Sequence, residues 1–171
     1  RYGLAKANTG LIDKYNNILK EEPDNEKVKY DLVWCYYRNG MSDKCIEVLT
    51  GFTPSEENRC EYYDLLGRNY MYIKEYDKAL ESLFAWRDAI LDIPEDDQSE
   101  KAVKNRNRFC YVNYYIGECY LNIKNYEEAR KYLEDTLKLI EEMSDSASKQ
   151  RIDEKVNYIF NKEIVKLLIK Y

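Results

Sequence analysis

Histidine is absent from this 171-residue sequence. Histidine is the most frequent general base near neutral pH and the most frequent metal ligand in proteins, so its absence excludes Ser-His and Cys-His nucleophile pairs. Gly67 and Gly117 are isolated, and neither can build a G-x-G-x-x-G or P-loop motif. Acidic runs such as Glu95-Asp96-Asp97 lie where solvated loops or helix ends are expected. We therefore predict a protein that is not an enzyme, with no catalytic residue, no cofactor and no metal.

Proline and glycine are scarce, at three and six residues, which leaves room for long uninterrupted helices. No segment shows the strict alternation of a strand. The apolar stretch from Leu65 to Tyr72 comes nearest, but Gly67, Arg68 and Asn69 break its alternation. The sequence predicts an all-α protein.

Long apolar runs are also missing: the longest are short, as at Leu167-Leu168-Ile169, whereas a bilayer span needs about 20 residues. The formal charge of −5 argues against nucleic acid, whose binding depends on basic patches. One basic run (Lys101, Lys104, Arg106, Arg108) follows the acids at 95–100, and a solvated face is favoured there over an anion site. We predict no membrane span and no nucleic-acid partner.

Five cysteines occur, without a C-x-x-C pair, and an odd number cannot all pair within one chain. Reduced thiols serving as small core residues are the simplest interpretation, and they favour a cytoplasmic location. Cys60 and Cys110 correspond to each other near the starts of two helices, where greater exposure is expected. The sequence begins at Arg1 with no initiator Met or signal peptide in view, as expected of a fragment or a processed form.

A repeat of 34 residues is the strongest signal. Small or apolar residues that would open successive helices stand at Leu11, Cys45 and Ala79, each 34 residues after the one before. Tyr63-x-x-Leu66-Gly67-x-x-Tyr70 precedes Ala79, and Asn113-x-x-Ile116-Gly117-x-x-Tyr120 precedes Ala129 in the same way. Ala129 follows Ala79 by 50 residues, and we expect the 16 extra residues mostly in longer helices, about two turns each.

These motifs resemble the tetratricopeptide repeat, a helix–turn–helix with the pattern W-x-x-L-G-x-x-Y, A-x-x-x-F and P. The tryptophan of the pattern is replaced by Lys29, Tyr63 and Asn113, and its glycine by Val33 in the first full repeat. A glycine inside a helix costs about 1 kcal/mol, so Gly67 and Gly117 are expected where a partner helix approaches closely.

The resemblance implies antiparallel helix hairpins stacked as a right-handed α-solenoid in a single domain spanning 1–171. We expect a half-repeat at about 1–25, repeats at about 26–58, 59–95 and 99–143, and a capping helix at about 148–171. Helices are predicted at about 9–22, 25–39, 42–50, 56–73, 76–93, 99–123, 125–143 and 148–170. The amphipathic last helix would cap the array; the alternative is a surface for a partner or for a homodimer.

In this family the first helices line a concave groove that holds a peptide. The resemblance therefore implies three sets of groove residues: Tyr30, Trp34, Tyr37 and Arg38; Asp64, Arg68, Met71 and Tyr72; and Tyr114, Glu118, Leu121 and Asn122. Chaperone co-factors of the family bind a peptide carboxylate with Lys, Asn and Arg. The matching places here carry Tyr30, Trp34 and Asp64, so that clamp is not expected.

The hypothesis is a non-catalytic scaffold that binds a protein or peptide partner through the concave face of its helices. Two alternatives stay open. One is a peptide-sensing domain of a larger transcription or signalling protein, and the other is an exported, envelope-associated repeat protein. Because one fold hosts many functions, the neighbouring sequence in the full gene would discriminate them.

Overall fold

A computed structural model describes residues 2–142, 149–152 and 154–157, with side chains from Thr9 onward. Every regular element in these residues is a helix, as the sequence predicts. The elements are α1 (Tyr2–Glu21), α2 (Glu26–Arg38), α3 (Ser42–Thr50), the 3-10 turn η1 (Glu56–Asn58), α4 (Arg59–Tyr72), α5 (Tyr76–Leu91), α6 (Glu100–Asn107), α7 (Phe109–Asn122) and α8 (Tyr126–Glu142).

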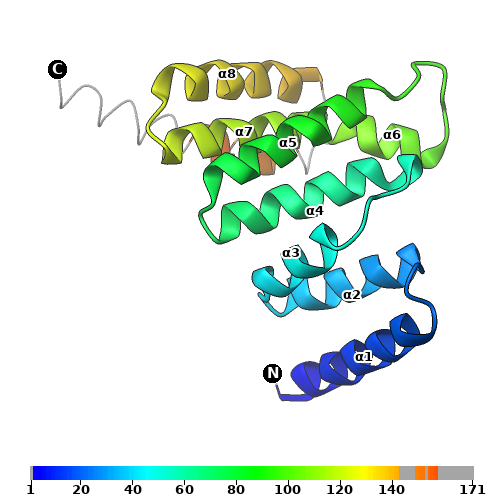
Figure 1. Ribbon diagram of the computed structural model, residues 1–171. Coiled ribbons are helices and arrows are strands. Elements are labelled where there is room, and N and C mark those ends of the chain that lie inside the picture. The colour runs from blue at the N-terminus through cyan, green and yellow to red at the C-terminus, as the bar shows by residue number, and fades with distance from the viewer. Residues whose placement is uncertain (1, 143–148, 153, 158–171) are drawn as a thin grey trace. The chain divides into compact units, whose positions relative to one another are not determined.

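The chain forms two compact units that divide within α5, one ending at Ser82 and the other beginning at Leu83. In the first unit, α1 packs on α2, α2 on α3 and α3 on α4, so that consecutive helices run side by side (Figure 1). In the second unit, α6 and α8 both pack on α7. Helix hairpins are thus the building block of each unit.

Three hairpin turns have the same backbone geometry. Gly40, Lys74 and Lys124 each follow a helix with positive φ, at 69°, 64° and 63°. Around Gly40, the amide of Met41 donates to the Tyr36 carbonyl at 3.0 Å and that of Gly40 donates to the Tyr37 carbonyl at 3.0 Å. The other two turns have the same pair of hydrogen bonds, which satisfies the last carbonyls of each first helix.

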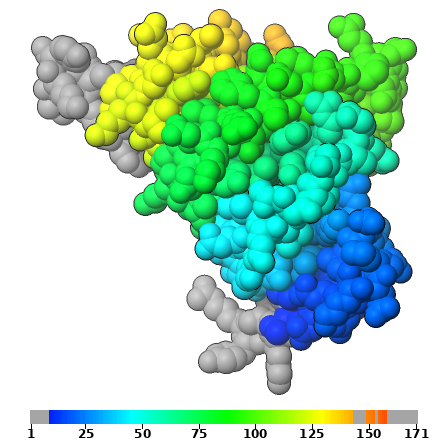
Figure 2. Space-filling view, in the orientation of Figure 1, coloured from blue at the N-terminus to red at the C-terminus, as the bar shows by residue number. Residues whose placement is uncertain are grey.

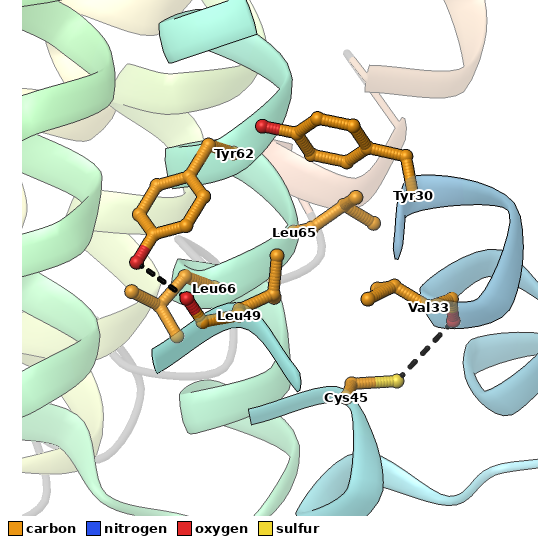
Figure 3. Close-up of a cluster of buried hydrophobic side chains, with 7 residues drawn as sticks. All are labelled: Tyr30, Val33, Cys45, Leu49, Tyr62, Leu65 and Leu66. Atoms are coloured by element: carbon orange, nitrogen blue, oxygen red, sulfur yellow. Dashed lines mark hydrogen bonds between the residues drawn. The ribbon is translucent and has the colours of Figure 1, made fainter. Parts of the chain in front are cut away.

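The core of the first unit lies where α2, α3 and α4 meet. Buried Val33, Cys45, Leu49 and Leu65 are all 0 % exposed (Figure 3). The Tyr62 hydroxyl, which lies in this core, donates to the Leu49 carbonyl at 2.8 Å. Each buried aliphatic side chain contributes about 1.5–3 kcal/mol, so this core accounts for much of the stability of the hairpin pair. In the space-filling view, side chains occupy the spaces that the ribbons of α1, α2 and α3 leave open (Figure 2).

The core of the second unit joins α5, α7 and α8. Trp86 is fully buried and stacks on Tyr115 with ring centroids 6.3 Å apart. A Cβ placed on Gly117 would lie 2.8 Å from the Cγ and Cδ2 atoms of Leu133 on α8. Gly117 therefore faces a neighbouring helix at close range, which is the role that the sequence predicts for it.

Two details of the predicted helices are wrong. The helix expected over 99–123 is broken at Arg108, where φ is −87° and ψ is −2°, into α6 and α7. The 16 extra residues therefore do not simply lengthen two helices, because α6 is a separate helix of 8 residues. The Arg106 guanidinium on α6 donates to the carbonyls of Pro94 and Asp97 and so ties α6 to the preceding loop.

All five cysteines are reduced and buried. The expectation of greater exposure is wrong for Cys60 and Cys110, which are 7 % and 3 % exposed. Cys110 packs among α7, α8 and the C-terminal segment, and its thiol lies 3.8 Å from the Thr136 carbonyl. The thiols thus serve as small core residues.

The predicted terminal helix at 148–170 falls mostly outside the described residues. Within it, residues 149–152 and 154–157 are helical. Ile152 and Val156 are buried against Tyr114 of α7 and Ile140 of α8. This part of the chain covers one end of the second core.

Candidate binding face

The predicted groove residues fall into three rows that differ in exposure. Tyr30, Asp64 and Tyr114 occupy equivalent places and are buried, at 5 %, 0 % and 7 % exposed. Four residues later, the side chains are half-buried: Trp34, Arg68 and Glu118. Four residues further on they are exposed: Arg38, Tyr72 and Asn122. The residues of the first row therefore belong to the cores of their units, whereas those of the other two rows are partly or fully exposed.

In the first unit the structure brings four predicted residues together across α2 and α4. The Arg68 guanidinium lies 5.2 Å from the Tyr37 ring centroid and 6.0 Å from that of Trp34. It also donates to the Tyr37 hydroxyl at 3.2 Å. Trp34 and Tyr37 themselves meet edge to face, with centroids 5.6 Å apart. Arg68 thus connects one hairpin to the next.

The charge of Arg68 is balanced inside this cluster. Its guanidinium nitrogens lie 2.6 and 3.0 Å from the two carboxylate oxygens of Asp64. Since Asp64 is fully buried, it serves to fix the guanidinium rather than to contact a ligand. The geometry holds the two rings and the cation in one rigid arrangement.

Glu61 is a member of the cluster that the sequence analysis missed. The Trp34 indole N–H donates to Glu61 Oε1 at 2.8 Å, which links α2 to the first turn of α4. A signal was present, since Glu61 stands two helical turns before Arg68 and so shares its face. The repeat pattern alone does not mark that position.

Tyr30 belongs to the core rather than to the open face. Its ring meets Phe52 edge to face at 5.7 Å, and it packs with the buried residues of α2, α3 and α4. Burial raises the pKa of the Tyr30 phenol, and the nearby carboxylates of Glu26 and Glu61 raise it further. The phenol therefore stays neutral under ordinary conditions.

In the second unit, Tyr114 and Glu118 are close neighbours on α7 and lie beside the C-terminal segment. Burial raises the pKa of Glu118, while Lys155 and a hydrogen bond from Tyr114 partly offset that effect. Leu121 packs against the core, and the side chain of Asn122 donates to the Glu118 carbonyl at 2.8 Å. Part of this α7 face is therefore already in contact with the chain's own C-terminal residues.

The remaining residue of the predicted face, Met71, is half-buried on α4, next to Tyr72. Tyr72 is the most exposed large apolar side chain among the described residues, at 73 %. Within those residues, no group of three or more Cys, Asp or Glu side chains is arranged to hold a metal ion. No helix there combines the length and apolar character needed to cross a bilayer.

Hairpins with a shared register define an α-helical repeat protein. The particular repeat follows from sequence comparison, because residues 111–139, which span α7 and most of α8, match the tetratricopeptide repeat family. The chain therefore carries a tetratricopeptide repeat, in agreement with the resemblance of its motifs. The tetratricopeptide repeat is a scaffold fold that is typically non-catalytic.

Two crystal structures of MamA are similar to this chain, each at 24 % sequence identity. One similarity covers 77 % of this chain and 87 % of the MamA chain with a TM-score of 0.42, and the other covers 80 % and 85 % with a TM-score of 0.46. Among curated proteins, none matches.

Proposed function

We propose that this chain is a non-catalytic scaffold that binds a protein or peptide through the first helices of its hairpins. The observation that carries the proposal is the cluster of Trp34, Tyr37 and Arg68, held together across α2 and α4. Large aromatic side chains and arginine dominate the energy of protein interfaces, because they bury much area at little entropic cost.

The exposed row supports the same proposal. Arg38 and Tyr72 occupy the same place on successive first helices and are both exposed. They can therefore contact a partner without any rearrangement of the hydrophobic core. Since the buried row holds the helices in register, a partner would meet a preorganised surface, which lowers the entropic cost of binding.

A selection from a displayed library of random peptides on the full chain tests the proposal. The selected peptides are then titrated against the Tyr72→Ala, Arg38→Ala and Leu91→Ala variants. Leu91 is the matched control, because it is 57 % exposed but lies on a second helix. We expect the first two variants to lose at least about fivefold in affinity, as truncated interface anchors do, and the control to lose nothing.

If all three variants bind every selected peptide with equal affinity, the proposal that the first helices form the binding face is wrong. Arg68→Ala and Trp34→Ala are less suitable probes, because both residues also join α2 to α4.

Two finer points stay predictions, namely a homodimer through the C-terminal helix and a cytoplasmic location. Sedimentation velocity at several protein concentrations would test the first of them.

A further inference from the structure

Glu61 is a carboxylate of the first unit that has no cation of its own. Asp64 is paired with Arg68, and Asp31 is paired with Lys27 at 3.0 Å. Glu61 lies one helical turn before Asp64 on α4, and among the residues that the structure describes it forms no ion pair. The carboxylate of Glu61 instead accepts the indole N–H of Trp34 through one oxygen. The charge of this site is therefore negative.

The aromatic rings beside Glu61 are suited to a second cation. A guanidinium or ammonium group is attracted to the face of a tryptophan or tyrosine ring within about 6 Å of its centroid. Arg68 already shows this geometry against Tyr37 and Trp34. A cation from a partner would find an aromatic ring and an unbalanced carboxylate at the same place. Neither feature favours an anion.

We propose that Glu61 and Trp34 form a recognition site for a lysine or arginine side chain of the bound peptide. This inference rests on the proposed function and names the chemical class of its ligand. The charge of the whole chain, −5, favours the approach of such a basic partner. Arg38, an exposed cation of α2, lies one helical turn beyond Trp34.

The substitution that tests the site is Glu61→Gln. Glutamine keeps a carbonyl oxygen that can accept the Trp34 indole N–H, but it removes the charge. The fold is therefore expected to survive, and circular dichroism and urea unfolding verify that it does. Glu47→Gln on α3 is the matched control, since Glu47 is 68 % exposed and lies on a second helix.

The probes are four end-blocked hexapeptides on one Gly/Ser background, carrying at one position arginine, lysine, glutamate, or citrulline as the neutral counterpart of arginine. The chain has two tryptophans, and Trp86 is fully buried, so the indole N–H signal of Trp34 reports on the site in NMR titrations. The arginine and lysine peptides are expected to shift the Trp34 signal and not the Trp86 signal. Glu61→Gln should weaken the affinity for the arginine peptide and for the lysine peptide by about two- to fivefold, the usual effect of one partly exposed ion pair. Glu47→Gln should leave both affinities unchanged.

Equal shifts with the citrulline and arginine peptides, a preference for the glutamate peptide, or no shift with any peptide would overturn the cation site. The scaffold function is judged separately by the library selection. If selected peptides depend on Tyr72 and Arg38 but carry no lysine or arginine preference, the scaffold stands and the cation site falls. If the selection yields no peptide that depends on the first helices, the scaffold itself fails.

Discussion

Arg68 and Asp64 form an ion pair on α4, one helical turn apart, in which the carboxylate is almost completely removed from water. The side chain of Asp64 is 1 % exposed and that of Arg68 is 17 % exposed. A buried carboxylate costs several kcal/mol unless a cation and hydrogen bonds replace its water. Asp64 therefore depends on Arg68, and Arg68 is in turn fixed against the Tyr37 and Trp34 rings.

Arg68→Ala should lower the free energy of unfolding by about 3 kcal/mol, because it leaves Asp64 buried without its cation. The double variant Asp64→Ala, Arg68→Ala should regain part of that loss, since it removes the stranded charge. Arg130→Ala is the control: Arg130 pairs with Glu134 at the same spacing but is 75 % exposed, so about 0.5 kcal/mol or less is expected. Urea unfolding measures all three, and a double variant no more stable than Arg68→Ala would contradict this account.

Gly117→Ala should destabilise the protein by about 1–3 kcal/mol, although alanine is the better helix former. The added methyl group would lie 2.8 Å from the Cγ and Cδ2 atoms of Leu133. Gly10→Ala provides the opposite case, because Gly10 lies in α1 with nothing within 4 Å of its added Cβ, and a gain of up to about 1 kcal/mol is expected. Thermal and urea unfolding distinguish the two, and similar gains for both would show that Gly117 is not at a close contact.

Lys74→Gly and Lys124→Gly should each stabilise the protein by about 0.5–1 kcal/mol. Both lysines hold a positive φ, which is unfavourable for a residue with a side chain and free of strain for glycine, as at Gly40. Lys78→Gly makes the same exchange inside α5 and should cost about 1 kcal/mol. Urea unfolding measures the change in unfolding free energy of each variant. A gain at Lys74 and Lys124 with a loss at Lys78 would support the turn geometry, whereas a loss at all three positions would contradict it.

Stability at acidic pH should depend on Glu26. Its Oε1 atom accepts hydrogen bonds from the Ser55 amide at 3.0 Å, the Ser55 hydroxyl at 3.2 Å and the Asn58 side chain at 3.2 Å. Burial alone would raise the pKa of Glu26, but these hydrogen bonds to the charged form hold it below 4.5, its usual value. A carboxyl with a lower pKa in the folded state adds stability above its unfolded pKa, and that stability is lost as the pH falls through the folded pKa.

Between about pH 5 and pH 3, the wild type should therefore lose more unfolding free energy than Glu26→Gln does. Urea titrations at the two pH values provide the comparison, with Glu47→Gln as the variant that should follow the wild type. An identical pH dependence in wild type and Glu26→Gln would mean that the link from Glu26 to Ser55 does not contribute.

The cysteines should be unreactive while the protein is folded. Burial raises the pKa of Cys45 to about 12, and it likewise raises the pKa of Cys110 to about 11. At neutral pH these thiols are protonated, and the thiolate is the form that reacts. A thiol reagent such as dithionitrobenzoate should label the native protein only as fast as the protein unfolds locally or globally. In urea, all five cysteines should react at once. Rapid labelling of the native protein would contradict the burial of these residues.

Hairpins and their register could be predicted because the sequence repeats its packing residues. Cys45 and Ala129 are both 0 % exposed at the starts of α3 and α8, as their small side chains indicate. The break at Arg108 could not be predicted, because no proline or glycine marks the site. Next to the break the structure has a tertiary contact that the sequence does not mark, in which Arg106 donates to the loop before α6.

The candidate face was predicted in part. The residue numbers of the face follow from the period, but the exposure of its rows does not, so Tyr30 and Tyr114 were placed at the surface of the groove and are in fact buried. Tyrosine is equally common in cores and at interfaces, since it has a large apolar ring and one polar group. Only its neighbours decide between the two.

The sequence by itself determined that this chain is helical, that its helices form hairpins, and that a tetratricopeptide repeat lies within it. A period of 34 residues suffices for that, because helix length, turn position and buried face all repeat with it. The tertiary structure decided that Trp34 meets Glu61 and that Arg68 meets Tyr37, since these contacts depend on how far one helix is shifted along the next. A periodic pattern fixes which side of a helix faces inward, but not which residues touch across two helices.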